Sequence, residues 1–390
     1  MKWILLLLIF LELFRPVYAY ASPSFLEQQS NAEKPAIQSE AAVLIDSRSG
    51  DVLYEKNSNE VLAPASITKI VTGIIALEHS NPDEDVIVSH NARYVDGTRV
   101  FLAEGEHKKL GELLYGLLMN SGNDAAVAIA EHIDGSTEAF CKRMNAFVAS
   151  IGAVHTHFVN PNGLYDKEHV TTASDMAKIA AYAMKNNTFR TIVSTQVKPW
   201  SGQEWKSSLV NHNKMLSFYK GANGVKNGYT RQSGFTLVTS AERNGTELLA
   251  VIMKADTDRQ IYKETAQLLD YGFAHYATVR ALNTGENIVQ GKESYYSNTA
   301  VYASIPKGDS FHVRIDKDKR LVVETKSGHI QRYASLLKKT TNDTAAANGL
   351  TNGKNDEEPQ LVREGEIALG FGAILYTAWK ANTIFRRRRI

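Results

Sequence analysis

GVKNGYTRQSGFTLVTSAERNGTELLAVIMKAD, residues 224–256, is the stretch that decides the fold. It holds three runs (224–230, 234–242 and 246–256) that are rich in β-branched, aromatic and other apolar residues and are separated by short polar turns. Such runs, bounded by Gly, Asn and Ser, are typical of strands. Asn244-Gly245 between two of them is a strong hairpin signal. We therefore predict three consecutive antiparallel strands.

Elements on either side extend this sheet. Residues 41–57 contain two β-rich runs around Ser49-Gly50, which predicts another hairpin. Helical spacing follows over 66–80, 110–134, 136–151 and 171–186, and returns after the strands over 259–276. We predict one α+β domain over residues 41–281, whose antiparallel sheet gathers both ends of the domain around an inserted helical block.

The sequence pattern changes beyond about residue 282. Short β-rich runs continue to residue 337 and predict a small all-β domain over 282–337. Residues 338–362 are rich in Asn, Thr and Gly, which indicates a linker. The segment 363–390 carries an apolar run followed by four arginines, and we predict a C-terminal membrane-anchoring helix there. An amphipathic helix lying in the membrane interface and an ordinary core helix are the alternatives.

The N-terminal residues predict export. Lys2 precedes an apolar run over 3–14, and the small residues at 19–21 suit cleavage after Ala21. We predict a signal peptide over 1–21 and a flexible leader over 22–40; an uncleaved anchor or a buried strand is the alternative. The mature protein is then expected on the outer face of the bacterial cytoplasmic membrane, held there by its C-terminal helix.

The composition is that of a globular protein, with 43% hydrophobic and 22% charged residues. A formal net charge of +2 gives no case for nucleic-acid binding, so no nucleic-acid partner is predicted. Cys141 is the one cysteine, which excludes an intramolecular disulfide. It lies in a helical pattern and is expected to be a small buried residue.

A serine three residues before a lysine can form a nucleophile–base pair, because the two side chains share one helix face. The chain has four such pairs, but three fall in a loop, in the small β domain or near the linker: Ser217–Lys220, Ser304–Lys307 and Ser335–Lys338. Only Ser66-Ile-Thr-Lys69 begins an apolar helix. It is therefore the candidate for acyl-transfer chemistry.

Two further short patterns each occur twice. A Ser-x-Asn unit occurs at Ser89–Asn91 and at Ser121–Asn123, and the second lies in a turn between two predicted helices. The alternative interpretation of Ser121–Asn123 is structural: these residues would cap the end of one helix and the start of the next. A Lys-x-Gly unit occurs as Lys226-Asn227-Gly228 on the first predicted strand and at 326–328, in what reads as a hairpin turn. A cation on a strand can bind an anionic substrate group, and a glycine lets substrate backbone approach.

PASITK (64–69), SGNDAAVAIAEHI (121–133) and GVKNGYT (224–230), in this order, resemble the penicillin-binding D-Ala-D-Ala carboxypeptidases. These are low-molecular-mass serine peptidases of bacterial cell walls. FVNPNGLYD (158–166), TTASDMAKIA (171–180) and ADTDRQ (255–260) also look like segments of that family. The resemblance covers about residues 40–280, and it implies the penicillin-binding/serine β-lactamase-like fold.

The resemblance implies a reaction and its catalytic residues. Ser66 is expected to be acylated, with Lys69 as general base, while Ser121 and Asn123 shuttle protons and hold Lys69 and the substrate. Backbone N–H groups of Ser66 and Tyr229 are expected to form the oxyanion hole. The substrate is the peptidoglycan pentapeptide, β-lactam antibiotics acylate the same serine, and no metal or organic cofactor is expected.

The same resemblance implies a carboxylate pocket for the substrate. Its residues lie on one strand and at the start of a later helix: Lys226, Asn227, Gly228, Tyr229, Thr230 and Arg259. Asn227 departs from the family pattern, which has threonine between this lysine and glycine. Its larger amide puts affinity for substrate and penicillin in question, more than the chemical step.

Three other functions share these motifs. A serine β-lactamase also needs a carboxylate that activates the deacylating water, and the region after Ser121 offers no clear Glu-x-x-x-Asn segment. A D,D-endopeptidase would use the same residues on cross-links. A catalytically impaired wall-binding or penicillin-sensing protein is the third possibility, with Asn227 as the damaging change.

Overall fold

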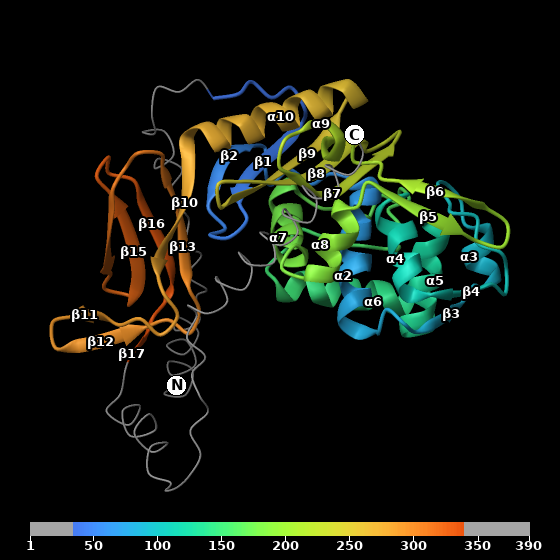
Figure 1. Ribbon diagram of the computed structural model, residues 1–390, viewed down its shortest axis with the longest axis horizontal. Helices are drawn as coiled ribbons and strands as arrows, with labels where there is room; N and C mark the ends of the chain where they lie inside the picture. Colours follow the sequence, from blue (N-terminus) through green and yellow to red (C-terminus); the bar gives the residue numbers. More distant parts are fainter. Residues whose placement is uncertain (1–33, 339–390) are drawn as a thin grey trace, which may run out of the picture. The chain divides into compact units, whose positions relative to one another are not determined.

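The structure is a computed structural model that describes residues 34–338 (Figure 1). Its main sheet is antiparallel, with strand order β2-β1-β9-β8-β7. The strands are β1 (Ala41–Asp46), β2 (Val52–Lys56), β7 (Ala222–Thr230), β8 (Gly234–Arg243) and β9 (Thr246–Ala255). The three consecutive strands, the N-terminal hairpin and the meeting of early and late strands in one sheet are thus as predicted.

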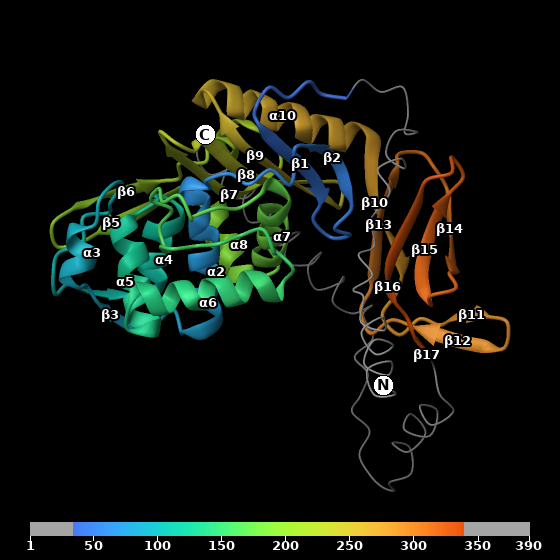
Figure 2. The same ribbon diagram turned by 180° about the vertical axis from the view of Figure 1, so that it is seen from behind.

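Both faces of this sheet are buried, because successive side chains of a strand point to opposite sides. On β1, Val43 and Ile45 belong to one apolar cluster, while Ala42 and Leu44 belong to another. The second cluster is completed by α10 (Asp258–His275), and the first by the helices between β2 and β7. Figure 2 shows α10 on the opposite side of the sheet from α2 and α7. The result is a three-layer α/β/α arrangement.

The helical block lies between β2 and β7 and includes two small hairpins. The helices are η3 (Ala65–Thr68), α2 (Lys69–His79), α3 (His90–Tyr94), α4 (Leu110–Leu118), α5 (Asn123–Asp134), α6 (Thr137–Ser150), α7 (Ala173–Ala183), α8 (Asn187–Ser194) and α9 (Met215–Phe218). The hairpins are β3 (Asp85–Ile87) with β4 (His107–Lys109), and β5 (Val197–Ser201) with β6 (Lys206–Val210). Neither hairpin was predicted from the sequence.

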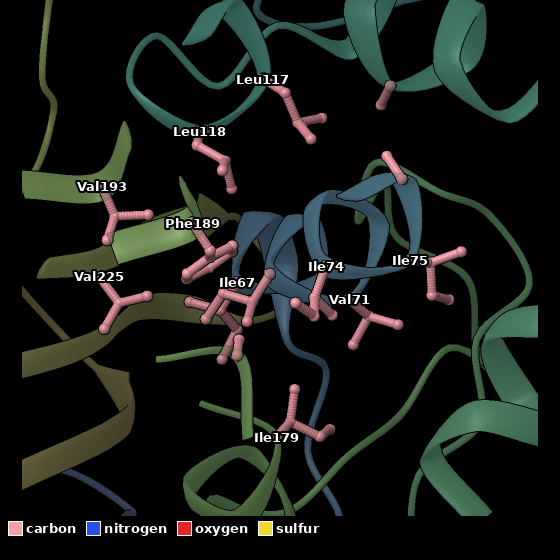
Figure 3. Close-up of a cluster of buried hydrophobic side chains, with 14 of the residues drawn as sticks. Ile67, Val71, Ile74, Ile75, Leu117, Leu118, Ile179, Phe189, Val193 and Val225 are labelled. Atoms are coloured by element: carbon pink, nitrogen blue, oxygen red, sulfur yellow. The ribbon is translucent and has the colours of Figure 1, made fainter. Parts of the chain in front are cut away.

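Helix α2 lies at the centre of the larger core. Figure 3 shows Ile67 and Ile74 surrounded by side chains from four other elements. These are Leu117 and Leu118 of α4, Ile179 of α7, Phe189 and Val193 of α8, and Val225 of β7. A helix buried on nearly every side cannot shift easily, so its first turn is a rigid support for a reactive side chain.

The strands after α10 form three smaller sheets. They are β10 (Tyr276–Leu282) with β13 (Val301–Pro306); β11 (Ile288–Gln290) with β12 (Glu293–Tyr296) and β17 (Leu337–Lys338); and β14 (Phe311–Ile315) with β15 (Arg320–Thr325) and β16 (Ile330–Ser335). β10 begins directly after α10 and pairs with β13, although the sequence pattern changes only near residue 282. All-β structure is therefore present where it was predicted and begins earlier than the pattern indicated.

Several predictions lie outside the described residues. They are the signal peptide over 1–21, the leader up to residue 33, the linker beyond residue 338 and the C-terminal anchor over 363–390. The end of the predicted flexible leader differs from the prediction: Ile37 and Ser39 are buried, and the Ser39 hydroxyl donates to the Glu264 carboxylate at 2.5 Å. Lys338, the first residue of the predicted linker, is the last residue of β17. Within residues 34–338, none of the helices combines the length and apolar character needed to cross a bilayer.

Candidate active site

Ser66 and Lys69 lie at the start of the buried helix. Ser66 is in the single turn η3 and Lys69 is the first residue of α2. The spacing of three residues brings the two side chains together, with Lys69 Nζ 3.0 Å from Ser66 Oγ. The Ser217–Lys220 and Ser304–Lys307 pairs show no such contact within the described chain. The Ser304 hydroxyl, for example, donates to the Asp46 carboxylate at 2.6 Å.

The Lys69 amine is completely buried and contacts three oxygen atoms. Besides Ser66 Oγ, it donates to Asn123 Oδ1 at 2.7 Å and to the Asn162 carbonyl at 2.5 Å. A neutral amine has two N–H donors and one lone pair. Because the asparagine oxygens can only accept, they take the two N–H groups and leave the lone pair for the Ser66 hydroxyl. This is the geometry required of a general base.

Electrostatics favour that neutral form. Burial lowers the pKa of Lys69 well below its usual value of 10.5, and the positive charge of Lys226 lowers it further, while Asp124 opposes the shift. Burial also lowers the pKa of Lys226, to about 7. Protonation of both buried amines would place two positive charges close together, which is unfavourable. One of the two lysines is therefore readily neutral near neutral pH.

The turn before α5 places Ser121 and Asn123. Ser121 is buried and has a left-handed backbone, with φ +63°. Such a backbone is strained for serine and persists only where its surroundings impose it. Within the described residues, the Ser121 hydroxyl makes no hydrogen bond. By contrast, Ser89 of the other Ser-x-Asn unit caps α3, and its Asn91 is exposed.

Strand β7 runs against the start of the buried helix. A Cβ atom placed on Gly228 would lie 2.6 Å from the Ser66 backbone nitrogen and 2.7 Å from Thr236 Oγ1. The approach is possible only because residue 228 is glycine. It places the backbone of β7 beside the Ser66 N–H, where an oxyanion hole made by Ser66 and Tyr229 requires it.

Lys226 and Asn227 are in contact with each other. Lys226 is 1% exposed, and its Nζ donates to the Asn227 carbonyl at 2.9 Å and to Asn227 Oδ1 at 3.2 Å. The side-chain oxygen of Asn227 is thus turned toward the cation. Threonine, the family residue, has a shorter side chain that also offers a hydroxyl donor.

In the described part of the chain, the side chains of Tyr229, Thr230 and Arg259 form no hydrogen bond or ion pair with Ser66, Lys69 or Lys226. Tyr229 is 58% exposed and stacks on Phe235 with a centroid distance of 4.5 Å. The Thr230 hydroxyl lies 2.6 Å from the Ser233 hydroxyl in the β7–β8 turn. Arg259 is exposed on the first turn of α10 and, among residues 34–338, forms no ion pair. Lys326-Ser327-Gly328, the second Lys-x-Gly unit, lies in the β15–β16 turn as predicted.

The structure adds residues that sequence reasoning missed. The carbonyl of Asn162 contacts Lys69, and Gly163 lies against the Ala65 carbonyl. Asp124 is buried and accepts hydrogen bonds from the Val100 and Leu102 N–H groups. These bonds hold the segment before α4 in place. The Asp96 carbonyl of the same segment accepts from Asn123 Nδ2. A contact made by a backbone carbonyl does not depend on the residue type, so it cannot be predicted from the sequence. The charged Asp124 next to Asn123 is the one feature in the sequence that pointed to these contacts.

His212 is another residue near the site that the sequence analysis did not identify. Its N–H donates to the Met119 carbonyl at 3.0 Å, two residues before Ser121. Burial, followed by the charges of Lys226 and Lys69, lowers its pKa to about 4. A neutral imidazole therefore lies in the electrostatic neighbourhood of both amines at neutral pH.

Two other features have no role in this site. Cys141 is buried on α6, as predicted, and burial raises the pKa of its thiol to about 11. Such a thiol is a poor nucleophile. Over residues 34–338, no group of three or more His, Cys, Asp or Glu side chains is arranged to hold a metal ion.

The α+β fold and the Ser66–Lys69 pair together define a serine-type peptidase of the penicillin-binding class. The sequence model of the D-alanyl-D-alanine carboxypeptidase family matches residues 28–257. The chain belongs to this family.

Individual relatives agree with this assignment. The chain is 32% identical over 316 residues to the D-alanyl-D-alanine carboxypeptidase DacF of Bacillus subtilis, which covers 79% of this chain and 78% of that protein. It is 31% identical to DacA of Haemophilus influenzae, over 78% of this chain and 81% of that one. Among solved structures, penicillin binding protein 5 of Haemophilus influenzae superimposes with a TM-score of 0.69 at 27% identity, covering 78% of this chain and 98% of that chain. Penicillin binding protein 6B of Escherichia coli gives 0.66 at 26% identity, covering 79% and 97%.

Proposed function

We propose that this protein removes the terminal D-alanine from peptidoglycan stem peptides through a seryl acyl-enzyme, and that penicillin acylates the same serine. The observation that carries the proposal is the buried Lys69 amine, 3.0 Å from Ser66 Oγ and held by two further oxygen acceptors. This is a nucleophile beside a base that is itself oriented by a third group.

Acylation follows from this arrangement. Ser66 Oγ attacks the carbonyl carbon of the D-Ala–D-Ala peptide bond and transfers its proton to Lys69 Nζ. The carbonyl oxygen becomes an oxyanion, which the N–H groups of Ser66 and Tyr229 stabilise. The C–N bond then breaks, and the departing D-alanine amine takes up the proton from Lys69 Nζ through the Ser121 hydroxyl, which leaves Lys69 neutral again. Water finally hydrolyses the ester and regenerates Ser66.

Substrate orientation is assigned to β7. The Lys226 cation is the partner for the terminal carboxylate, with Thr230 and Arg259 in supporting roles. Asn227 and Gly228 form the edge along which the substrate backbone lies. Burial lowers the pKa of Lys226 to about 7, and a bound carboxylate opposes this shift because an opposite charge favours the protonated amine.

The same proposal covers domain organisation and location. We assign catalysis to a domain over 41–281 and a separate all-β domain to 282–337. Different apolar clusters in the two regions support this division, although Val279 and Ala281 of the first region pack on the clusters of the second. The family acts on a substrate in the cell wall, so we propose an exported protein, attached to the outer face of the membrane through residues 363–390. The linker over 338–362 would then connect the all-β domain to the membrane anchor.

Release of D-alanine from a purified wall pentapeptide tests the function. We expect turnover by the wild type and none by Ser66→Ala. Covalent labelling by penicillin without D-alanine release would instead support the penicillin-sensing alternative. Cleavage of a cross-linked muropeptide dimer, with no release from the pentapeptide, would support a D,D-endopeptidase.

Asn227→Thr is expected to accelerate acylation roughly tenfold, since it removes an acceptor that competes for a charged donor. In the empty site Asn227 Oδ1 lies 3.2 Å from Lys226 Nζ and competes with a substrate carboxylate. Threonine is favoured in strands, so the melting temperature should change little. Stopped-flow measurement of labelling by a fluorescent penicillin gives the rate.

Asn223→Thr is the matched control, because it makes the same change on the same strand, where Asn223 donates to Glu247. It should leave the acylation rate unchanged. Slower acylation in Asn227→Thr would mean that Asn227 is adapted to its substrate and is not a handicap.

A further inference from the structure

A buried histidine connects the turn that carries Ser66 to the loop that covers Lys69. His169 is 1% exposed, and both of its ring nitrogens are bonded. The Val159 N–H donates to His169 Nδ1 at 3.1 Å, and Thr68 Oγ1 lies 2.8 Å from His169 Nε2. None of these contacts is part of the acylation mechanism given above.

The direction of this hydrogen-bond chain is fixed by its first member. A backbone N–H can only donate, so His169 Nδ1 is the acceptor and the proton of the neutral ring is on Nε2. Nε2 therefore donates to Thr68 Oγ1. The Thr68 hydroxyl in turn donates to the Ala65 carbonyl at 2.8 Å. The chain runs without interruption from Val159 through His169 and Thr68 to Ala65.

The far end of this chain holds a strained peptide. Ala65 has a left-handed backbone with φ +53°, which is unfavourable for a residue with a Cβ atom. Its carbonyl belongs to the peptide unit whose N–H is that of Ser66. Fixing the Ala65 oxygen therefore fixes the direction of the Ser66 N–H, one of the two proposed oxyanion donors.

The near end of the chain holds the loop over Lys69. Val159 precedes Pro161 and Asn162, whose carbonyls accept from Thr72 Oγ1 at 2.6 Å and from Lys69 Nζ. One imidazole ring thus braces both the peptide beside the nucleophile and the loop that orients the base.

We propose that His169, acting through Thr68, is a positioning residue for acylation: its neutral ring holds the Ala65–Ser66 peptide and the Asn162 loop in their reactive arrangement. The inference rests on the proposed acylation of Ser66. A doubly protonated ring would turn an N–H group toward the Val159 N–H, so protonation would break the chain.

The surroundings keep the ring neutral over a wide range. Burial lowers the pKa of His169 to about 4, the nearby His157 and Lys69 add to the shift, and Asp166 opposes it. The Phe158 ring packs against the imidazole with a centroid distance of 5.1 Å. The brace is therefore intact at neutral pH and is lost as the pH falls toward about 4.

Acylation rates of His169→Gln and Thr68→Val, measured against pH, test the proposal. The glutamine of His169→Gln places its amide near the position of His169 Nε2, so it keeps a donor for Thr68 but has no acceptor at the position of Nδ1, where Val159 binds. Thr68→Val removes the hydroxyl at constant shape. At neutral pH each should acylate about tenfold more slowly than the wild type, as expected for loss of one buried hydrogen bond. Near a pH of about 4 the deficit of His169→Gln should largely disappear, because the wild type has then lost the same brace.

Two variants serve as controls. Thr68→Ser restores the hydroxyl and should restore the rate. Thr239→Val makes the same isosteric change at a buried threonine whose hydroxyl has no partner among the described residues, and it should have no effect. Circular dichroism at each pH confirms that a variant is folded.

The possible results distinguish a failure of this inference from a failure of the proposed function. If His169→Gln acylates more slowly than the wild type by the same factor at both pH values, the role of His169 is merely structural and the inference is overturned. The inference is also overturned if His169→Gln acylates as fast as the wild type. If the wild type itself is not acylated on Ser66, the proposed function fails first.

Discussion

Replacing Lys69 by methionine is expected to slow acylation of Ser66 by about a hundredfold to ten-thousandfold, the usual contribution of a positioned general base. Methionine matches the length of the lysine stem but has no lone pair able to take the seryl proton. It also leaves Asn123 Oδ1 and the Asn162 carbonyl without their donor. The measurement is the second-order rate of labelling by a fluorescent penicillin.

Lys108→Met is the matched control for this prediction. Lys108 is also buried, donates to the Ser201 carbonyl at 2.6 Å and lies over the Trp200 ring. Its substitution removes a buried, bonded amine outside the site, so it should lower the melting temperature without a comparable loss of acylation. Equal rates for Lys69→Met and the wild type would contradict the role of Lys69 as general base.

Gly163→Ala is expected to reduce acylation by about a hundredfold or more, because small displacements of reacting groups are this costly. Gly163 has φ +87°, and a Cβ atom there would lie 2.0 Å from the Ala65 oxygen and 2.5 Å from the Ala65 carbonyl carbon. Backbone atoms cannot rotate away, so the loop and the Ser66 turn must separate. The amine of Lys69 then loses the Asn162 carbonyl that orients it.

Gly135→Ala separates this clash from simple backbone strain. Gly135 ends α5 with φ +76°, and a Cβ atom there would meet nothing within 4 Å. Both substitutions place alanine in a left-handed backbone, at a cost of about 1–2 kcal/mol each. Thermal unfolding should show a loss for both variants, and penicillin labelling a loss for Gly163→Ala alone. A similar loss of labelling in both variants would show that strain, and not contact with Ala65, is responsible.

Much of the fold follows from local sequence patterns. The alternation of apolar residues and the Asn244-Gly245 turn predicted β7, β8 and β9, because a two-sided sheet and a tight turn each demand particular residues. The short hairpins β3–β4 and β5–β6 have mixed composition and are stabilised by their surroundings. β10 follows α10 without a turn signal, so its pairing with β13 could not be read from the chain.

The candidate site could be predicted in part. Ser66, Lys69 and Asn123 were selected by their spacing and by the order of the motifs, and the structure brings these three together. The contacts made by Asn162 and Gly163 are backbone contacts, which most residue types can make. His169 was not singled out, since one histidine in a polar loop carries no pattern until Thr68 and Val159 are placed beside it.

Mass spectrometry of the penicillin adduct tests the central claim most directly. The wild-type protein, incubated with excess penicillin and digested, should carry one added penicillin mass on the peptide that contains Ser66. The Ser66→Ala variant should carry none. An adduct on another serine, an adduct that persists in Ser66→Ala, or a wild type that stays unmodified at high penicillin concentration would contradict the account.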